Sequence, residues 1–322
     1  MGMGASTLPL LMALKRRGYI PNGSAVIEIG AQQLDESFVG ATEDIAATGR
    51  FFGVTGPPPA FAWNGPRSDT NVLAGAPLAR EFWTWLGLNY ASIDIDGSPG
   101  SIPLDLNYDE VPTELVGRYD IVTNFGTTEH VANQLQSFKI IHDLAAPGAI
   151  MLHVVPTSGM LNHGFISYNP KFFWMLRRSN GYIVAYMTMS RSDPDSEFPK
   201  DVTDYLSLYD PPVQSRFGNC RIPEIALIVA LQKIYDMPFI SPIDVQTGTT
   251  TEDVALRERY WTVFNPDALV GSGFAARAMA RLQRWGYARC PTWLVAAKRW
   301  VLGRKVFGAP VAGSKITRPP KG

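Results

Sequence analysis

The chain has 322 residues, of which 46% are hydrophobic and 18% are charged, a composition typical of a folded core that excludes wholesale disorder. The formal net charge of +0 excludes a chain that is basic throughout, as many nucleic-acid-binding proteins are. The 2 cysteines, Cys220 and Cys290, lack metal-type spacing and indicate neither a disulfide framework nor a zinc site. No apolar run approaches the roughly 18 residues of a membrane span, and we expect a cytoplasmic protein.

The first predicted elements are an N-terminal helix capped near Ser6 or Thr7 and a buried strand at Ala25–Gly30. The next segment, Asp35–Ala47, is weakly helical. Proline and glycine in "GPPPAFAWNGPRSD" then exclude regular structure. "APLAREFWTWLGL" has the apolar pattern of a helix, and "YASIDID" alternates between apolar and polar residues, as a strand does.

Strands and helices continue to alternate in the second half of the chain. A strand is expected at Tyr119–Asn124, followed by the amphipathic helix "VANQLQSFKIIHDLAAPG", which Pro147 and Gly148 end, and by the strand "AIMLHVVP". "NPKFFWMLRRSNGY" predicts another helix, and "YIVAYMTMS" and "IALIVALQKI" predict two closing strands. The pattern predicts a Rossmann-like, doubly wound, mostly parallel seven-stranded α/β sheet within residues 1–249, with ligands at the carboxyl ends of the strands.

Two insertions and a C-terminal extension depart from this alternation. The insertions, at about 40–75 and 191–221, carry aromatic residues that could stack on a sugar or a flat ring, or form small cores beneath long loops. Residues 250–322 are predicted to form a basic helical extension with a disordered end, because no acidic residue follows Asp267. This extension could lie on an anionic membrane surface, contact a phosphate-bearing substrate or RNA, or pack on the acidic body as a solvated helix pair.

Polar residues at the predicted strand ends indicate a nucleoside-containing ligand. Gly30 permits a sharp turn and the close approach of a ligand to the backbone. Asp94 and Asp96 end the second strand, where a carboxylate can accept both hydroxyls of a ribose. Asp105, in "IPLDLN", is expected near an adenine amino group.

The ordered series "VIEIGA", "YASIDID", "PLDLN", "YDIVTNFGTTEHV" and "HDLAAPGAIMLHVVP" resembles the class I S-adenosylmethionine-dependent methyltransferases over about Ser24–Lys233. The resemblance implies an enzyme that uses S-adenosylmethionine as its cofactor. It also implies cofactor contacts along the first loop, the second strand, the segment after it and the end of the third strand, namely Glu28, Gly30, Ala31, Gln32, Asp94, Ile95, Asp105, Leu106, Asn124, Phe125, Gly126 and Thr127.

The first loop departs from the family's G-x-G-x-G pattern, which reads Gly30, Gln32 and Leu34 in this chain. We expect Gln32 and Gln33 to supply side-chain amide donors to the cofactor carboxylate. A dinucleotide pyrophosphate requires glycines for close approach to a helix N-terminus, so one glycine and two bulky glutamines disfavour a nicotinamide oxidoreductase.

Transfer of a methyl group to a hydroxyl calls for a base, and the chain has only 4 histidines. His130 and His163 are the candidate bases, with an ordinary structural role as the alternative for each, and His142 is interpreted as structural. "TEHV" also resembles part of a metal-assisted subgroup of O-methyltransferases in which two glutamates and a histidine hold a divalent ion. Glu129 and His130 match that set, but Gly126 occupies the earlier glutamate position, and no metal is predicted.

The sequence therefore predicts methylation, more readily on oxygen, of a small-molecule or carbohydrate-like acceptor. A nucleic-acid partner is disfavoured because no basic and aromatic patch is visible in the acidic body. Peripheral contact of the basic tail with an anionic membrane stays an open alternative. The rival function is a catalytically inactive, methyltransferase-like binding or scaffold protein, which the altered first loop would suit.

Overall fold

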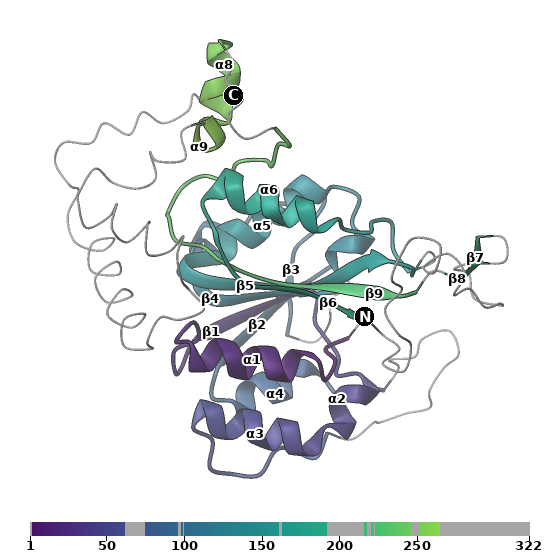
Figure 1. Cartoon of the computed structure of the whole chain (residues 1–322). Coiled ribbons are helices and arrows are strands. Elements are labelled where there is room, and N and C mark those ends of the chain that lie inside the picture. Colours follow the sequence, from purple (N-terminus) through teal and green to yellow (C-terminus); the bar gives the residue numbers. More distant parts are fainter. Residues whose placement is uncertain are drawn as a thin grey trace.

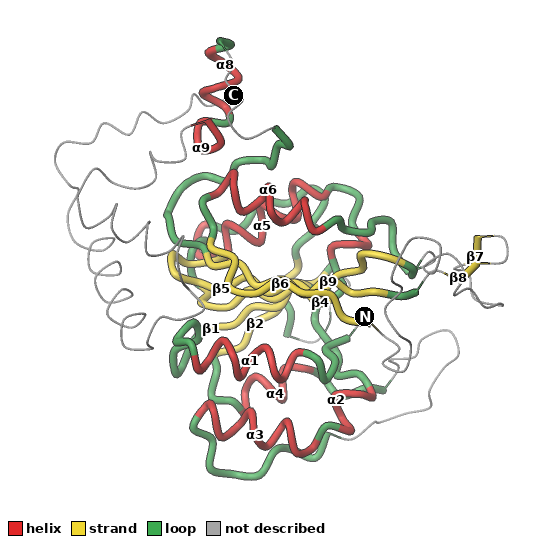
Figure 2. Tube along the Cα trace, in the orientation of Figure 1, coloured by secondary structure: helices red, strands yellow, loops and turns green. Residues whose placement is uncertain are grey.

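A computed structural model describes residues 2–61, 75–95, 98, 100–160, 163–191, 216–217, 220–221, 223–245 and 252–264. Within these residues the chain forms a seven-stranded sheet between two layers of helices (Figure 1). The same view coloured by secondary structure shows the strands of this sheet in one central layer (Figure 2). This three-layer arrangement is the predicted α/β class.

The sheet has the strand order β3-β2-β1-β4-β5-β9-β6. In chain order, its strands are β1 (Ala25–Ile29), β2 (Asn89–Asp94), β3 (Ile102–Pro103), β4 (Tyr119–Phe125), β5 (Ala145–Ser158), β6 (Ile183–Arg191) and β9 (Ile225–Gln232). The pairs from β3 to β5 are parallel, and β9 lies antiparallel between β5 and β6. The predicted mostly parallel seven-stranded sheet is confirmed. Its order reverses between β1 and β4, which is where doubly wound folds bind their ligands.

Alternate residues of each strand enter opposite cores, as the period of a strand requires. Val26 and Ile121 pack beneath the N-terminal helices, whereas Ile27 and Val122 pack beneath the later helices. One face is covered by α1 (Thr7–Arg16), α2 (Glu36–Gly40), α3 (Thr42–Phe52) and α4 (Ala79–Trp85), and the other by α5 (Gln134–Leu144) and α6 (Pro170–Asn180) (Figure 1). Both faces are thus buried, which accounts for the nearly continuous apolar runs of the strands.

Two helix boundaries differ from the predicted ones. The weak helix expected at Asp35–Ala47 is divided into α2 and α3 near Ala41, and α3 continues to Phe52, where Gly53 ends it in the left-handed conformation. The helix expected to run to Pro147 ends at Leu144, because Ala145 already pairs with Tyr119 of β4. Tertiary pairing therefore overrides the local proline and glycine signal.

The first insertion is described as far as Phe61 and contains α3, whereas only short parts of the second insertion and of the C-terminal extension are described. β7 (Arg216–Phe217) and β8 (Cys220–Arg221) form a two-stranded sheet, and α8 (Val254–Arg259) precedes α9 (Trp261–Phe264). The hydroxyl of Thr262 donates to the Ser179 carbonyl and joins α9 to α6. Most of the predicted basic tail, 265–322, lies outside the described residues, so its membrane contact stays a prediction. In the part of the chain that the structure describes, no helix is long and apolar enough to span a bilayer.

Candidate active site

The turn after β1 depends on the glycine at position 30. Gly30 has φ +76°, and its N–H donates to the Ile93 carbonyl of β2 at 2.9 Å. A Cβ at this position would lie 2.6 Å from Oγ1 of Thr127, closer than real contacts allow. Only glycine lets the first loop pass this close to the turn after β4, and the predicted sharp turn is confirmed.

The carboxylate of Asp94 lies directly beside the first loop. Its Oδ2 accepts a hydrogen bond from the Ala31 N–H at 2.8 Å. The predicted proximity of the Gly30 turn and Asp94 is therefore confirmed. Ile95 follows with 69% of its surface exposed, and Leu104 N donates to the Asp94 carbonyl at 3.3 Å. This arrangement brings a carboxylate, an exposed apolar side chain and a glycine turn to one edge of the sheet.

Asp105 and Leu106 continue from the segment beside Asp94. Oδ1 of Asp105 accepts a hydrogen bond from the Asn107 N–H at 2.8 Å, and Leu106 is buried in the core beneath α5. Asp96, the other carboxylate of "SIDID", lies outside the described residues. The segment thus has the place that the sequence assigned to it, next to the end of β2.

Glu28 anchors the first loop by a hydrogen bond to its backbone. Its carboxylate is fully buried and accepts hydrogen bonds from Trp83 Nε1 at 2.7 Å, from Tyr90 OH at 2.8 Å and from the Gln32 N–H at 3.0 Å. Burial raises the pKa of Glu28 to about 7, and the three donors oppose this rise by stabilising the charged form. Glu28 is therefore a positioning residue for the loop.

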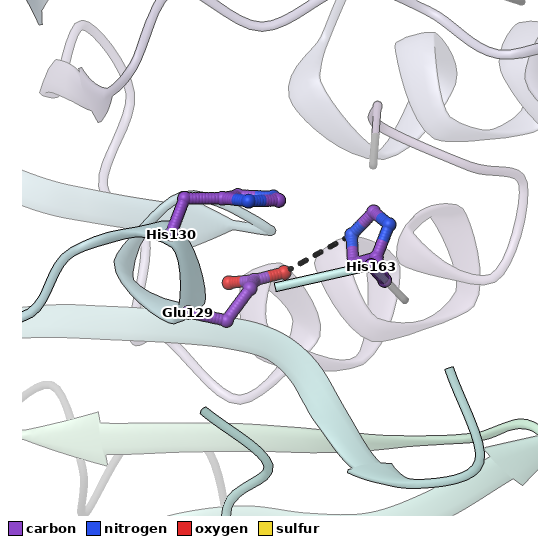
Figure 3. A group of neighbouring side chains, drawn as sticks. All are labelled: Glu129, His130 and His163. Atoms are coloured by element: carbon purple, nitrogen blue, oxygen red, sulfur yellow. Dashed lines mark ion pairs between the residues drawn. The ribbon is translucent and has the colours of Figure 1, made fainter. Parts of the chain in front are cut away.

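A second buried carboxylate, Glu129, lies just after β4 in the 3₁₀ turn η2 (Thr128–His130). The loop after β5 closes over it, because the N–H groups of Phe165 and Ile166 donate to the Glu129 carbonyl at 2.8 and 3.2 Å. Nε2 of His163 lies 3.5 Å from Oε1 of Glu129 (Figure 3). The rings of His130 and His163 have centroids 4.9 Å apart. The two candidate bases are thus brought together around one carboxylate.

The polar atoms of this group lack ordinary hydrogen bonds. Neither carboxylate oxygen of Glu129 nor Nε2 of His163 has a hydrogen-bond partner among the described residues. Burial lowers the pKa of His130, the carboxylate of Glu129 raises it in part, and His163 lowers it further. Buried polar groups are normally satisfied, and an exception in a native fold indicates a functional or ligand-binding role.

A comparison with protein families found one match. Residues 60–188, from within the first insertion into β6, match the family model described as "Methyltransferase domain". The strand order and the Gly30–Asp94 arrangement agree with this match. This segment therefore matches a methyltransferase domain, in agreement with the resemblance of the sequence motifs to the class I S-adenosylmethionine-dependent methyltransferases. A methyltransferase domain needs a methyl donor, and S-adenosylmethionine stays the cofactor that the sequence motifs predict.

Solved structures similar to the methyltransferase were also found. A 1,6-didemethyltoxoflavin-N1-methyltransferase of Burkholderia thailandensis with bound S-adenosylhomocysteine is 9% identical, with a TM-score of 0.35 and coverage of 71% of this chain and 79% of that one. A phosphoethanolamine N-methyltransferase 2 of Haemonchus contortus in complex with S-adenosyl-L-methionine is 13% identical, with a TM-score of 0.39 and coverage of 72% and 53%. The comparison with curated proteins found no match.

The expected role of Gln32 in the methyltransferase is corrected by the structure. Its side-chain amide is buried and lies 3.3 Å from the Ile29 carbonyl, 3.2 Å from the Gly30 carbonyl and 3.0 Å from Thr127 Oγ1. The side chain therefore braces the turn from inside and does not present donors to a cofactor carboxylate. It occupies space beneath the single-glycine loop.

The side chains of Asn124 and Phe125 also face away from the expected cofactor position. Asn124 is fully buried, donates from Nδ2 to Thr128 Oγ1 at 2.8 Å and accepts from the Thr128 N–H at 3.1 Å. Phe125 packs in the core beneath the N-terminal helices. At positions 124 and 125 only the backbone is left to border the cofactor. The next two residues form the turn: Gly126 has φ +82°, and the Thr127 hydroxyl donates to the Ile29 carbonyl at 2.6 Å.

The other two histidines are internal. His142 contacts Tyr182 OH through Nδ1 at 2.6 Å and the Met237 carbonyl through Nε2 at 2.7 Å. Since a carbonyl only accepts, Nε2 carries the hydrogen and Nδ1 accepts from the tyrosine. Burial lowers the pKa of His142 and of His153 to about 3. The structural interpretation of His142 is confirmed.

Sequence reasoning missed two features of the site. It did not find the donors Trp83 and Tyr90 that satisfy Glu28, because they come from distant elements. It also considered only Glu129 and His130 as metal ligands, whereas the structure adds His163 to the same group. The signal for this third candidate was the segment "NHGF" at the end of a loop after a strand, where site residues of this fold gather.

Proposed function

We propose that the methyltransferase transfers the methyl group to a hydroxyl oxygen of a small-molecule or carbohydrate-like acceptor. The observation that supports this function most directly is the pairing of His163 with the buried carboxylate of Glu129 at the end of β4. Thr127, two residues before Glu129, hydrogen-bonds to the backbone of the first loop. The pair therefore stands beside the edge that the cofactor would occupy.

The residues at this edge fit S-adenosylmethionine. The Gly30 turn leaves room for the amino-acid part, and the Asp94 carboxylate, held by the Ala31 N–H, would accept hydrogen bonds from the ribose hydroxyls. Ile95 would offer an apolar surface to the adenine, with the Asp105–Leu106 segment alongside. When bound, the cofactor supplies an electrophilic methyl carbon attached to a sulfonium.

The protein's task is to align the acceptor and to accept a proton. With the cofactor bound, the residues at this edge would hold the acceptor oxygen in line with the methyl carbon that the cofactor supplies. The hydroxyl proton passes to Nδ1 of His163, whose Nε2–H faces Glu129. The carboxylate then stabilises the imidazolium, as the orienting carboxylate does in other acid–base pairs. His130, exposed on the other side of Glu129, is the second candidate for the proton.

The acceptor class is supported by the surface beside this pair. Phe165, two residues after His163, has 76% of its surface exposed. An exposed aromatic ring next to a base suits the flat or partly apolar face of a sugar or ring compound. It would be a poor neighbour for a strongly charged acceptor.

Calorimetry with S-adenosylmethionine and S-adenosylhomocysteine tests the cofactor site first. The wild-type chain should bind at micromolar concentrations, and Asp94→Ala should weaken binding by about tenfold or more, the effect of losing a charged hydrogen-bond acceptor. Absence of binding by the wild type would instead favour a scaffold protein.

Acceptor panels in which a hydroxyl, an amine or a thiol is carried on the same ring test the methylated atom. Transfer to the hydroxyl compounds is expected. His163→Gln should lower kcat by about 100-fold or more and leave the cofactor dissociation constant unchanged. Transfer to amines alone, or full activity of His163→Gln, would contradict the proposed function.

A further inference from the structure

Three potential metal-ligand atoms converge beside the proposed acceptor position. Glu129, His130 and His163 each offer one such atom, and these atoms all lie within 4.8 Å of one another. Figure 3 shows the two imidazole rings flanking the carboxylate. Metal–ligand bonds of about 2.1 Å would need the three atoms to be about 3–4 Å apart. Two of these atoms, Nε2 of His163 and Oε1 of Glu129, already lie 3.5 Å apart.

The carboxylate of Glu129 is buried without accepting a hydrogen bond from the described residues. It is 0% exposed, and neither of its oxygens accepts a hydrogen bond from the described residues. The nearest cationic candidate, His163 Nε2, stands 3.5 Å from Oε1 without forming a hydrogen bond. A buried charge is normally paired or coordinated to a metal, since an unpaired one is costly.

The fold holds this group together by specific backbone features. Two N–H groups, those of Phe165 and Ile166, donate to the Glu129 carbonyl and fix the loop after β5 against η2. Gly164 makes this approach possible, because a Cβ there would lie 2.9 Å from both the Cγ and the carbonyl oxygen of Glu129. Met160, which accepts the His163 N–H, has φ +49°, a conformation that non-glycine residues rarely adopt. Backbone strain of this kind concentrates at ligand sites.

We propose that Glu129, His130 and His163 bind one divalent first-row transition-metal ion, such as Mn²⁺, Co²⁺ or Zn²⁺. Two imidazoles and one carboxylate form a ligand set that these ions accept while keeping open positions for water or a substrate. Mg²⁺ fits less well, because it prefers oxygen ligands in an octahedral arrangement. This inference reverses the prediction of no metal, which counted only two ligands.

The use of the ion in catalysis rests on the proposed function. An ion at this position would bind the acceptor hydroxyl and favour loss of its proton, so that the histidines would serve as ligands and not as bases. The two roles require different forms of His163. A metal ligand presents the lone pair of Nε2 to the ion, whereas a base oriented by Glu129 carries a hydrogen on Nε2.

Metal titration of the full chain tests the site without any acceptor. The protein is treated with a chelator, dialysed and titrated with Mn²⁺, Co²⁺ and Mg²⁺ by calorimetry, and bound Co²⁺ is also followed by its visible absorption. One Mn²⁺ or Co²⁺ ion should bind per chain, more tightly than Mg²⁺. Glu129→Gln and His163→Gln should each weaken binding by about tenfold or more. Glu110→Gln changes an exposed glutamate in the loop after β3; it is the matched control and should bind as the wild type does.

His130→Ala keeps the test valid if the buried variants fail to fold, because His130 is exposed. It too should weaken ion binding by about tenfold. No saturable binding by the wild type would overturn the proposal. Unchanged affinity in His130→Ala and Glu129→Gln would also overturn it, since the ion would then be bound elsewhere, for example by a cysteine.

Methyl transfer measured before and after chelation separates the two proposals. Loss of activity on chelation and its return with Mn²⁺ or Co²⁺ would support a catalytic ion. Full activity of the chelated enzyme would reject the catalytic use of the ion and leave the histidine base. Ion binding with no transfer to any hydroxyl would support the metal site and contradict the proposed function.

Discussion

Two fully buried glutamates stand at the same edge of the sheet and differ in every hydrogen bond. Glu28, at the end of β1, accepts from Trp83, Tyr90 and the Gln32 backbone. Glu129, just after β4, accepts from no described donor and is flanked by two histidines. Burial alone therefore does not reveal the role of a carboxylate. A carboxylate with its donors supplied by the fold is structural, and one left without them is available to a substrate, a proton or an ion.

The difference extends to the surrounding loops. The first loop is braced from inside by Gln32 and Thr127, so its shape is fixed before the cofactor binds. The β4 turn is fixed through its backbone, by Phe165 and Ile166, while the carboxylate of Glu129 accepts no hydrogen bond from the described residues. Preorganisation at the first loop and an unsatisfied carboxylate at the β4 turn are the combination that the proposed function requires, since such an enzyme aligns two reactants.

The largest expected effect is on stability, from Glu28→Ala. This change leaves the donors of Trp83, Tyr90 and Gln32 without an acceptor and should lower the free energy of unfolding by about 4 kcal/mol. Glu129→Gln should instead leave it unchanged or raise it, because an uncompensated buried charge is removed. Urea unfolding of both variants provides the comparison. Equal losses would show that the two glutamates are both structural.

The pH dependence of stability sharpens the assignment of Glu28. Its pKa is raised from the usual 4.5 to about 7, so the folded state holds the proton more tightly than the unfolded state does. The resulting contribution is complete below pH 4.5 and is lost as the pH rises through about 7, which amounts to about 3 kcal/mol.

The measurement is the unfolding free energy of wild type and Glu28→Gln from pH 4.5 to pH 8. The wild type should lose about 3 kcal/mol relative to the variant over this range. The buried histidines are common to both proteins, and their titration cancels in the difference. Parallel profiles would mean that Glu28 titrates normally in the fold.

Glycine at position 30 can be tested against a glycine of similar conformation. Gly30→Ala introduces a Cβ 2.6 Å from Thr127 Oγ1 at φ +76°, and should cost about 2 kcal/mol together with about tenfold in cofactor affinity. The control is Gly53→Ala, at φ +83°, where no described atom lies within 4 Å. It should cost only about 1 kcal/mol and leave cofactor binding intact. If Gly30→Ala and Gly53→Ala had equal effects on stability and on cofactor affinity, close packing at the first loop would not explain the need for glycine at position 30.

The smallest expected effect comes from Gly164→Ala, which acts on the other region. A methyl group there meets Glu129 and should displace the histidine group, lowering kcat by about tenfold. Cofactor affinity should stay within about twofold of the wild type, because the first loop is untouched. Paired measurement of kcat and cofactor affinity checks the separation. If kcat and cofactor affinity fell together, the first loop and the β4 turn would be energetically coupled, which would contradict the separation of the two regions.

The fold could be predicted from the sequence because strand patterns and glycine turns are local signals. Ala25–Gly30 and Tyr119–Asn124 were placed within a residue of β1 and β4. Boundaries such as that at Leu144 could not be predicted, since Ala145 joins β5 through pairing with a distant strand. The position of Asp94 beside the first loop followed from the parallel order of the strands.

Side-chain roles were predicted less well than positions. Gln32 and Asn124 have amide groups that a cofactor could use, but both side chains point inward and form hydrogen bonds within the protein. Nothing local in "IGAQQ" or "TNFG" shows this direction. The meeting of His163 with Glu129 depends on a loop crossing made possible by Gly164, which no spacing rule contains.

A crystal structure of the chain with S-adenosylhomocysteine would test the central claim most directly. We expect the ribose hydroxyls on the Asp94 carboxylate, the homocysteine part against the Gly30 turn and the sulfur directed toward Glu129, His130 and His163. A product bound elsewhere, or with its sulfur directed away from these three residues, would contradict the assignment of the acceptor side and the roles derived from it.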